Sequence, residues 1–84
     1  MMTHCYELNG DEMQTPEQTH AYLKKQLGFP AHYGMNLDAL ADCLTDYHEE
    51  TIFWVQNPEK VNFQIMHVLE QVSQKNPFLN IILE

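Results

Sequence analysis

The stretch YGMNLDALADCLTDY, residues 33–47, is the most informative part of this chain. It predicts a tight turn that leads into a short helix with two different faces. Apolar side chains recur at helical spacing and form one stripe, made of Leu37, Leu40 and Leu44, with Ala41 beside it. Acidic side chains recur four residues apart and form the acidic stripe, made of Asp38, Asp42 and Asp46. Like charges at this spacing cost about 0.2–0.5 kcal/mol per pair, which indicates that the concentrated negative charge has a use.

Length and composition limit the number of domains and indicate the charge of a binding partner. The 84 residues predict one domain over residues 1–84, with a single core and no deep active site. The 12 Asp and Glu against 4 Lys and Arg give a net charge of −8. Solubility is the plain explanation, and a basic partner reached by electrostatic steering is the sharper one. Direct binding of nucleic acid is disfavoured, because phosphates need Lys and Arg to neutralise them.

Hydrophobic periodicity outward from this stretch predicts alternating strands and helices. Strands are expected over residues 3–8, 51–56 and 78–83, and helices over residues 16–27, 37–47 and 59–75. The order β-α-α-β-α-β predicts an α/β fold in which a three-stranded parallel sheet is flanked by helices. The apolar run TIFWVQ at 51–56 predicts a central strand buried on both faces, with Trp54 in the core.

Local signals place the ends of the helices. Thr15 is expected to cap the first helix, with Gln18 completing a capping box, and Gly28 to end it. Asn36 is a good N-cap for the second helix. Asn-Pro pairs at 57–58 and 76–77 are expected to break the second strand and stop the third helix.

The residue types that carry catalysis or bind metals do not form a recognisable motif. The five histidines lack metal-ligand spacing; they are His4, His20, His32, His48 and His67. Cys43 has acidic neighbours, which disfavour a reactive thiolate, and it does not form a CxxC pair with Cys5. We therefore expect no enzyme, no cofactor and no metal. The sequence has no signal peptide and no membrane span, so we also expect a cytoplasmic monomer with reduced thiols.

A family resemblance covers most of the chain. Its motif is Tyr33-Gly34, Asn36-Leu37-Asp38-Ala39-Leu40 and Asp42-Cys43-Leu44-Thr45, and further matches are Asn9-Gly10, His20, Leu23-Lys24-Lys25, Leu27, Pro30 and Ile81-Ile82-Leu83. With these residues the chain resembles the barstar family, intracellular inhibitors of bacterial guanyl-preferring ribonucleases. The likeness is close over residues 8–47 and looser to residue 84.

The resemblance implies that the loop and the second helix plug the active site of a basic, barnase-like ribonuclease or a related toxin. Carboxylates would then stand where substrate phosphates lie. Asp42 matches the principal anchoring acid of the family, and Asp38 matches its partner one turn earlier. Further positions match as well, namely Asn36, Thr45 and the loop glycine Gly34.

Several positions depart from the family pattern. His32 and Ala41 stand where the family has an interface tyrosine and tryptophan, Asp46 replaces a glycine, and Gln71 replaces a glutamate on the third long helix. The segment between Trp54 and Val61 is also shorter, so an intervening helix is expected to be reduced or absent. The departures keep open an alternative, a barstar-like binding module that recognises a different basic protein or toxin.

Overall fold

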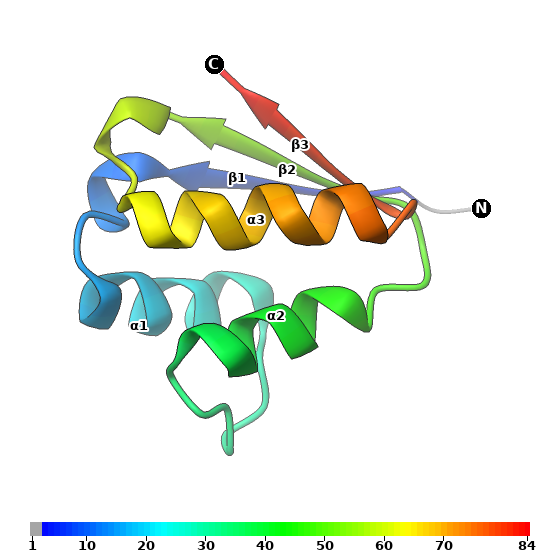
Figure 1. The fold of residues 1–84 in the computed structure, drawn as a ribbon, viewed down its shortest axis with the longest axis horizontal. Coiled ribbons are helices and arrows are strands. Elements are labelled where there is room, and N and C mark those ends of the chain that lie inside the picture. Colours follow the sequence, from blue (N-terminus) through cyan, green and yellow to red (C-terminus); the bar gives the residue numbers. More distant parts are fainter. Residues whose placement is uncertain (1–2) are drawn as a thin grey trace.

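The computed structural model describes residues 3–84 and has the predicted element order, with two short turns added (Figure 1). The strands are β1 (His4–Asn9), β2 (Thr51–Gln56) and β3 (Leu79–Leu83). The helices are α1 (Pro16–Leu27), α2 (Leu37–Thr45) and α3 (Phe63–Lys75), and the 3₁₀ turns are η1 (Gly10–Glu12) and η2 (Pro58–Lys60). The strands lie in the order β1-β2-β3, and both neighbouring pairs are parallel. The predicted three-stranded parallel α/β fold is confirmed.

The ends of α1 follow the expected local chemistry, with one difference. The Thr15 side chain accepts a hydrogen bond from the Gln18 amide at 3.2 Å, and Gly28 ends the helix in the left-handed region at φ 69°. The prediction that the Gln18 side chain completes a capping box by accepting from the Thr15 amide is wrong. The Gln18 side chain accepts from the amide of Gln14 at 3.3 Å, one residue before the expected partner.

The third helix begins later than predicted. Residues 58–60 form the separate turn η2, which the Asn57-Pro58 pair begins, and α3 starts only at Phe63. The Asn62 side chain caps α3 by accepting hydrogen bonds from the amides of Gln64 and Ile65. Val61 fits the helical spacing and is buried in the core, but it reaches the core from extended backbone outside the helix.

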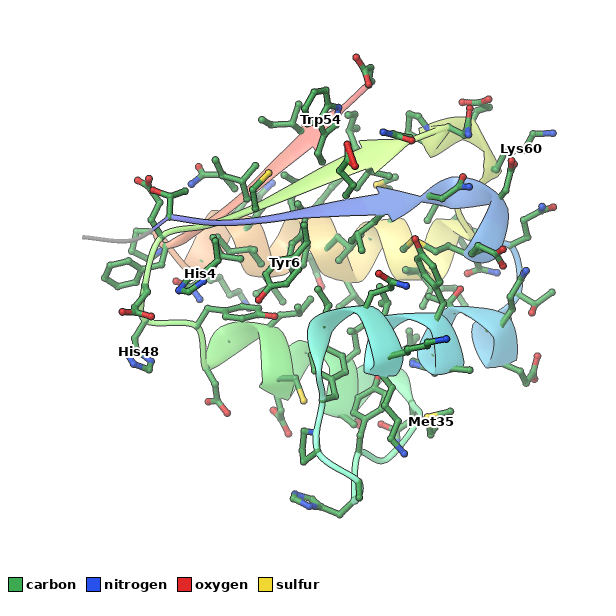
Figure 2. The ribbon with its side chains drawn as sticks, turned by 180° about the vertical axis from the view of Figure 1, so that it is seen from behind. His4, Tyr6, Met35, His48, Trp54 and Lys60 are labelled. Carbon is green, nitrogen blue, oxygen red and sulfur yellow. The ribbon has the colours of Figure 1, made fainter. Side chains whose placement is uncertain are left out.

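The helices cover only one face of the sheet (Figure 1). Burial therefore alternates along β2, and the prediction that this strand is buried on both faces is wrong. Trp54 was expected in the core, but it lies on the uncovered face and is 37% exposed (Figure 2). Its indole Nε1 donates to the Glu84 carboxylate at 2.9 Å, so the polar edge of the ring has a partner at the surface.

The core lies between the covered face of the sheet and the three helices. Its fully buried large apolar side chains come from every layer: Leu8, Met13, Leu23, Leu40, Leu44, Phe53, Val55, Ile65, Leu69 and Leu79. The apolar stripe of α2 packs chiefly against α3. Tyr47 follows α2 by two residues, and its ring packs on Phe53 of β2 in an edge-to-face arrangement, with ring centroids 5.9 Å apart. The core thus fixes α2 from behind and leaves its opposite face exposed.

Candidate functional site

Asp38 and Asp42 of the acidic stripe lie on the exposed face of α2, and Asp46 is the C-cap residue directly after it, so the helix ends two residues before the predicted residue 47. Leu40 and Leu44 on the other face have no exposed surface, and this burial fixes the rotation of the helix. Asp38, Asp42 and Asp46 are all exposed. Among residues 3–84 the structure has one ion pair, between His4 and Glu49, so no basic side chain of the described chain neutralises these acids. The stretch from residue 26 to residue 59 contains no Lys or Arg.

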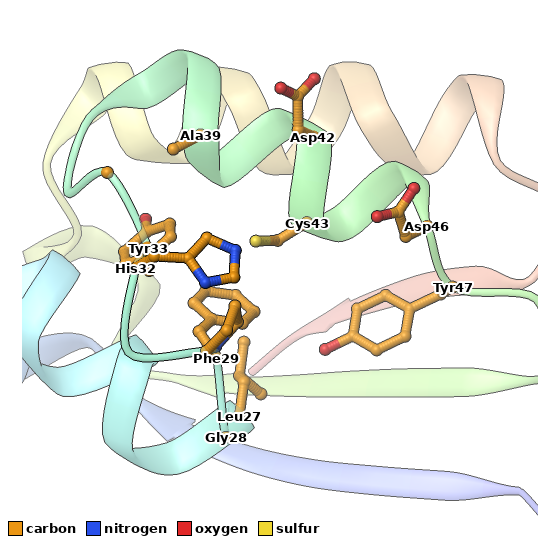
Figure 3. A pocket seen from close by; sticks show the side chains of 12 residues that line it. Leu27, Gly28, Phe29, His32, Tyr33, Ala39, Asp42, Cys43, Asp46 and Tyr47 are labelled. Carbon is orange, nitrogen blue, oxygen red and sulfur yellow. The ribbon is translucent and has the colours of Figure 1, made fainter.

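A hollow of about 470 Å³ lies beside the acidic stripe, between α2 and the loop that precedes it (Figure 3). Asp42 and Asp46 line it together with Cys43 from the α2 side. Aromatic and loop residues line the remainder, chiefly Phe29, His32, Tyr33, Gly34 and Tyr47. The hollow therefore combines an apolar floor with two carboxylates, a composition suited to a cationic group that also has flat apolar surface.

The loop over residues 29–36 has a defined conformation. The Asn36 side chain accepts from the Ala39 amide at 2.8 Å as the N-cap of α2, and it donates to the Gly34 carbonyl at 3.2 Å. Met35 adopts a left-handed conformation at φ 56°, which is uncommon for a residue with a side chain. A side chain at Gly34 would approach the Ala39 Cβ to 3.2 Å, so the loop passes close to the start of α2.

The structure places four of the nine residues predicted for the site around the hollow. His32, Gly34, Asp42 and Asp46 line the hollow, whereas Asp38 and Asn36 lie at the start of α2 outside its lining. The Thr45 hydroxyl donates to the Ala41 carbonyl at 2.6 Å, and Ala41 itself is half-buried against the core. Gln71 is exposed on α3 and does not line the hollow.

Sequence reasoning missed the apolar part of the hollow. Phe29 and Tyr47 line it, and so do Ala39 and Cys43 on the α2 side. Their sequence pattern is that of core residues, so only the spacing of Ala39 and Cys43, four apart beside the acids, offered a signal. Burial raises the pKa of the Cys43 thiol, and the Asp46 and Asp42 carboxylates raise it further. These surroundings disfavour a reactive thiolate at Cys43.

Two features of the described residues bear on the kind of site. Residues 3–84 contain no group of three His, Cys, Asp or Glu side chains placed to hold a metal ion. Within the same range, every helix is too short or too polar to cross a bilayer. The feature that stands out is an exposed, unneutralised acidic face beside an apolar hollow.

Comparison with known proteins points to one family. A putative ribonuclease inhibitor of Bacillus subtilis (strain 168), YrdF, is 48% identical over 40 residues. That alignment covers 48% of this chain and 44% of YrdF, so the chain spans less than half the length of this curated relative. Residues 3–77 match the family described as Barstar (barnase inhibitor). Because this match covers most of the 84 residues, the chain belongs to the barstar family.

Proposed function

We propose that this protein inhibits a basic ribonuclease of the barnase type by placing the acidic stripe and the preceding loop in the active site of the enzyme. The observation that carries the proposal is the acidic stripe itself: three exposed carboxylates, two on α2 and one at its C-cap, without basic partners among the described residues. Membership of the barstar family and the match to YrdF support the ribonuclease as target class.

The acidic stripe is chemically complementary to the phosphate-binding cleft of a ribonuclease. A ribonuclease cleft holds the RNA backbone with cationic side chains, and carboxylates at similar spacing can accept charge-assisted hydrogen bonds from them. Because α2 is fixed by its buried leucines, little conformational entropy is lost when the acids bind. His32 and Gly34 form the other wall of the hollow, where a side chain of the enzyme would be received.

The net charge of −8 adds a kinetic advantage. An acidic inhibitor and a basic enzyme attract each other before contact, which raises the association rate at low salt. Surface charges are screened beyond about 10 Å at 0.1 M salt. The association rate should therefore fall steeply as salt is added, while the dissociation rate changes little.

Titration into a barnase-like microbial ribonuclease, with RNA cleavage as the readout, tests the proposal. The test variant is Asp42→Asn, which removes one charge from the stripe and keeps the shape of the side chain. It should weaken inhibition by about 1.5–3 kcal/mol, the contribution of a hydrogen bond to a charged group. The matched control is Glu7→Gln, which removes one exposed charge from the uncovered face of the sheet.

Stoichiometric inhibition that Asp42→Asn weakens and Glu7→Gln preserves would support the proposal. Equal affinities for the two variants would contradict the role of the acidic stripe, because overall charge alone would then explain binding. Absence of inhibition by the wild-type protein would contradict a barnase-like target.

One observation favours a second candidate, a binding module for a different basic protein or toxin. Ala41 is small and half-buried, so the middle of the α2 surface lacks the aromatic side chain that commonly anchors a protein interface. An enzyme shaped around such an anchor would leave a void here. Capture of one basic, non-nuclease toxin by the wild-type protein, but not by Asp42→Asn, would favour this candidate.

A further inference from the structure

We propose that the buried hydrogen bond between His20 and Tyr33 positions the loop over residues 29–36 for the partner, so that both residues set affinity without contributing a charge to the interface. The inference rests on the proposed function, because it concerns the loop that forms one wall of the hollow. His20 belongs to α1, whereas Tyr33 lies between His32 and Gly34. Neither residue was a predicted interface position.

The pair forms a tight and buried connection between α1 and the loop. The His20 Nδ1 and the Tyr33 hydroxyl oxygen are 2.7 Å apart. The two residues are only 3% and 6% exposed. The Tyr33 ring also packs on Phe29, with centroids 4.8 Å apart. Tyr33 is thus held at its hydroxyl end by α1 and along its ring by the start of the loop.

The remaining hydrogen bonds that restrain the loop are exposed or local. The Lys24 ammonium donates to the Ala31 carbonyl at 3.4 Å on the surface, and Asn36 contacts Gly34 two residues away. The Tyr33 amide donates to the Pro30 carbonyl inside the loop itself. Among these contacts, the His20–Tyr33 hydrogen bond is the buried one that connects a side chain of this loop to another element. The directions of His32 and Gly34, on either side of Tyr33, depend on it.

The protonation states suit a permanent bond at neutral pH. Burial lowers the pKa of His20, although the nearby Glu17 carboxylate on α1 acts in the opposite direction. Burial raises the pKa of Tyr33 to about 12, so the phenol keeps its proton. A neutral imidazole and a neutral phenol form one hydrogen bond without placing a charge in the interior.

The test compares the removal of two tyrosine hydroxyls, one that holds the loop and one that lies outside the hollow. Tyr33→Phe removes the hydroxyl that bonds His20 and keeps the ring on Phe29. Tyr22→Phe is the matched control, because the Tyr22 hydroxyl accepts from the Asn9 amide at 2.9 Å, next to the sheet and outside the hollow. Both variants lose one partly or fully buried hydrogen bond, so both should lose thermal stability.

Only Tyr33→Phe should change binding. Under conditions where both variants are fully folded, we expect Tyr33→Phe to inhibit the ribonuclease about tenfold more weakly, and Tyr22→Phe to match the wild type. The amide resonances of His32 and Gly34 should shift or broaden in the free Tyr33→Phe protein only. His20→Asn, which keeps a polar atom near the position of Nδ1, should recover more affinity than His20→Ala.

A double-mutant cycle separates positioning from general loosening. If Tyr33 acts by holding His32, then His32→Ala should cost less affinity in the Tyr33→Phe background than in the wild type. Equal losses for Tyr33→Phe and Tyr22→Phe, with unchanged loop resonances, would overturn the inference. If the wild-type protein inhibits no ribonuclease, the proposed function fails, and the resonances of His32 and Gly34 still decide whether the pair holds the loop.

Discussion

Replacing Asn76 with alanine should lower the free energy of unfolding by about 3 kcal/mol, taken as three hydrogen bonds at about 1 kcal/mol each. The Asn76 Nδ2 donates to the carbonyls of Leu44 at 3.1 Å and Tyr47 at 3.0 Å, and a longer contact reaches the carbonyl of Thr45. The Asn76 Oδ1 accepts from the Phe78 amide at 2.9 Å. The residue is only 6% exposed, so water replaces these partners poorly.

Asn76→Asp sharpens this prediction because it keeps one half of the arrangement. The new carboxyl can still accept from the Phe78 amide, but its second oxygen would face the carbonyls at the negative end of α2. We expect a loss of stability at neutral pH at least as large as that of Asn76→Ala. The loss should shrink in acid, where the protonated carboxyl donates a hydrogen bond.

Urea unfolding followed by far-ultraviolet circular dichroism measures both variants, with Asn80→Ala as the control. Asn80 is exposed on β3 four residues away, so its replacement should have a small effect. A loss below about 1 kcal/mol for Asn76→Ala would refute the reasoning, because it would mean that water satisfies the end of α2 equally well.

Three further predictions concern stability. Leu40→Ala should lower the free energy of unfolding by about 2–5 kcal/mol because it leaves a cavity in the core. Asp38→Ala should be neutral or stabilising because it relieves repulsion between like charges. Thermal melts with the reverse order would contradict the division of α2 into a core face and an acidic face. Burial lowers the pKa of His20 in the folded protein, so the unfolded chain takes up its proton more readily. Stability should therefore be complete above about pH 6.5 and fall as the pH decreases through the lowered pKa, and urea melts of His20→Gln should lack this part of the pH dependence. Gly10→Ala should cost more than about 3 kcal/mol because the new methyl group would collide with the backbone carbonyl of Asn57, and a melting temperature equal to that of the wild type would contradict this close approach.

The elements with local signals were predictable from the sequence. Thr15 and Asn36 cap their helices as expected, and Gly28 ends α1, because each acts on backbone groups within a few residues. The predicted beginning of α3 at residue 59 was wrong, because the signal used there was also local. Val61 matches helical spacing, and periodicity alone cannot show that it reaches the core from a turn.

Features set by distant parts of the chain had no such signal. Trp54 and Ile52 make β2 continuously apolar, and the sequence does not state how many layers of helix will cover the sheet. The carboxylates of the acidic stripe could be placed because they lie within one short segment, two on α2 and one at its C-cap. The Asn76 contacts with the end of α2 join residues about thirty positions apart, and the His20–Tyr33 bond joins two separate elements.

The contact between Asn76 and α2 also orders events during synthesis of the protein. The ribosome releases a chain from its N-terminus at about 5–20 residues per second, so α2 emerges well before Asn76. Until then the carbonyls of Leu44 and Tyr47 lack the amide that later holds them. A nascent chain can therefore carry all three carboxylates of the acidic stripe while the end of α2 beside Asp46 is still loose. Rigid presentation of the stripe therefore has to wait until Asn76 has left the ribosome.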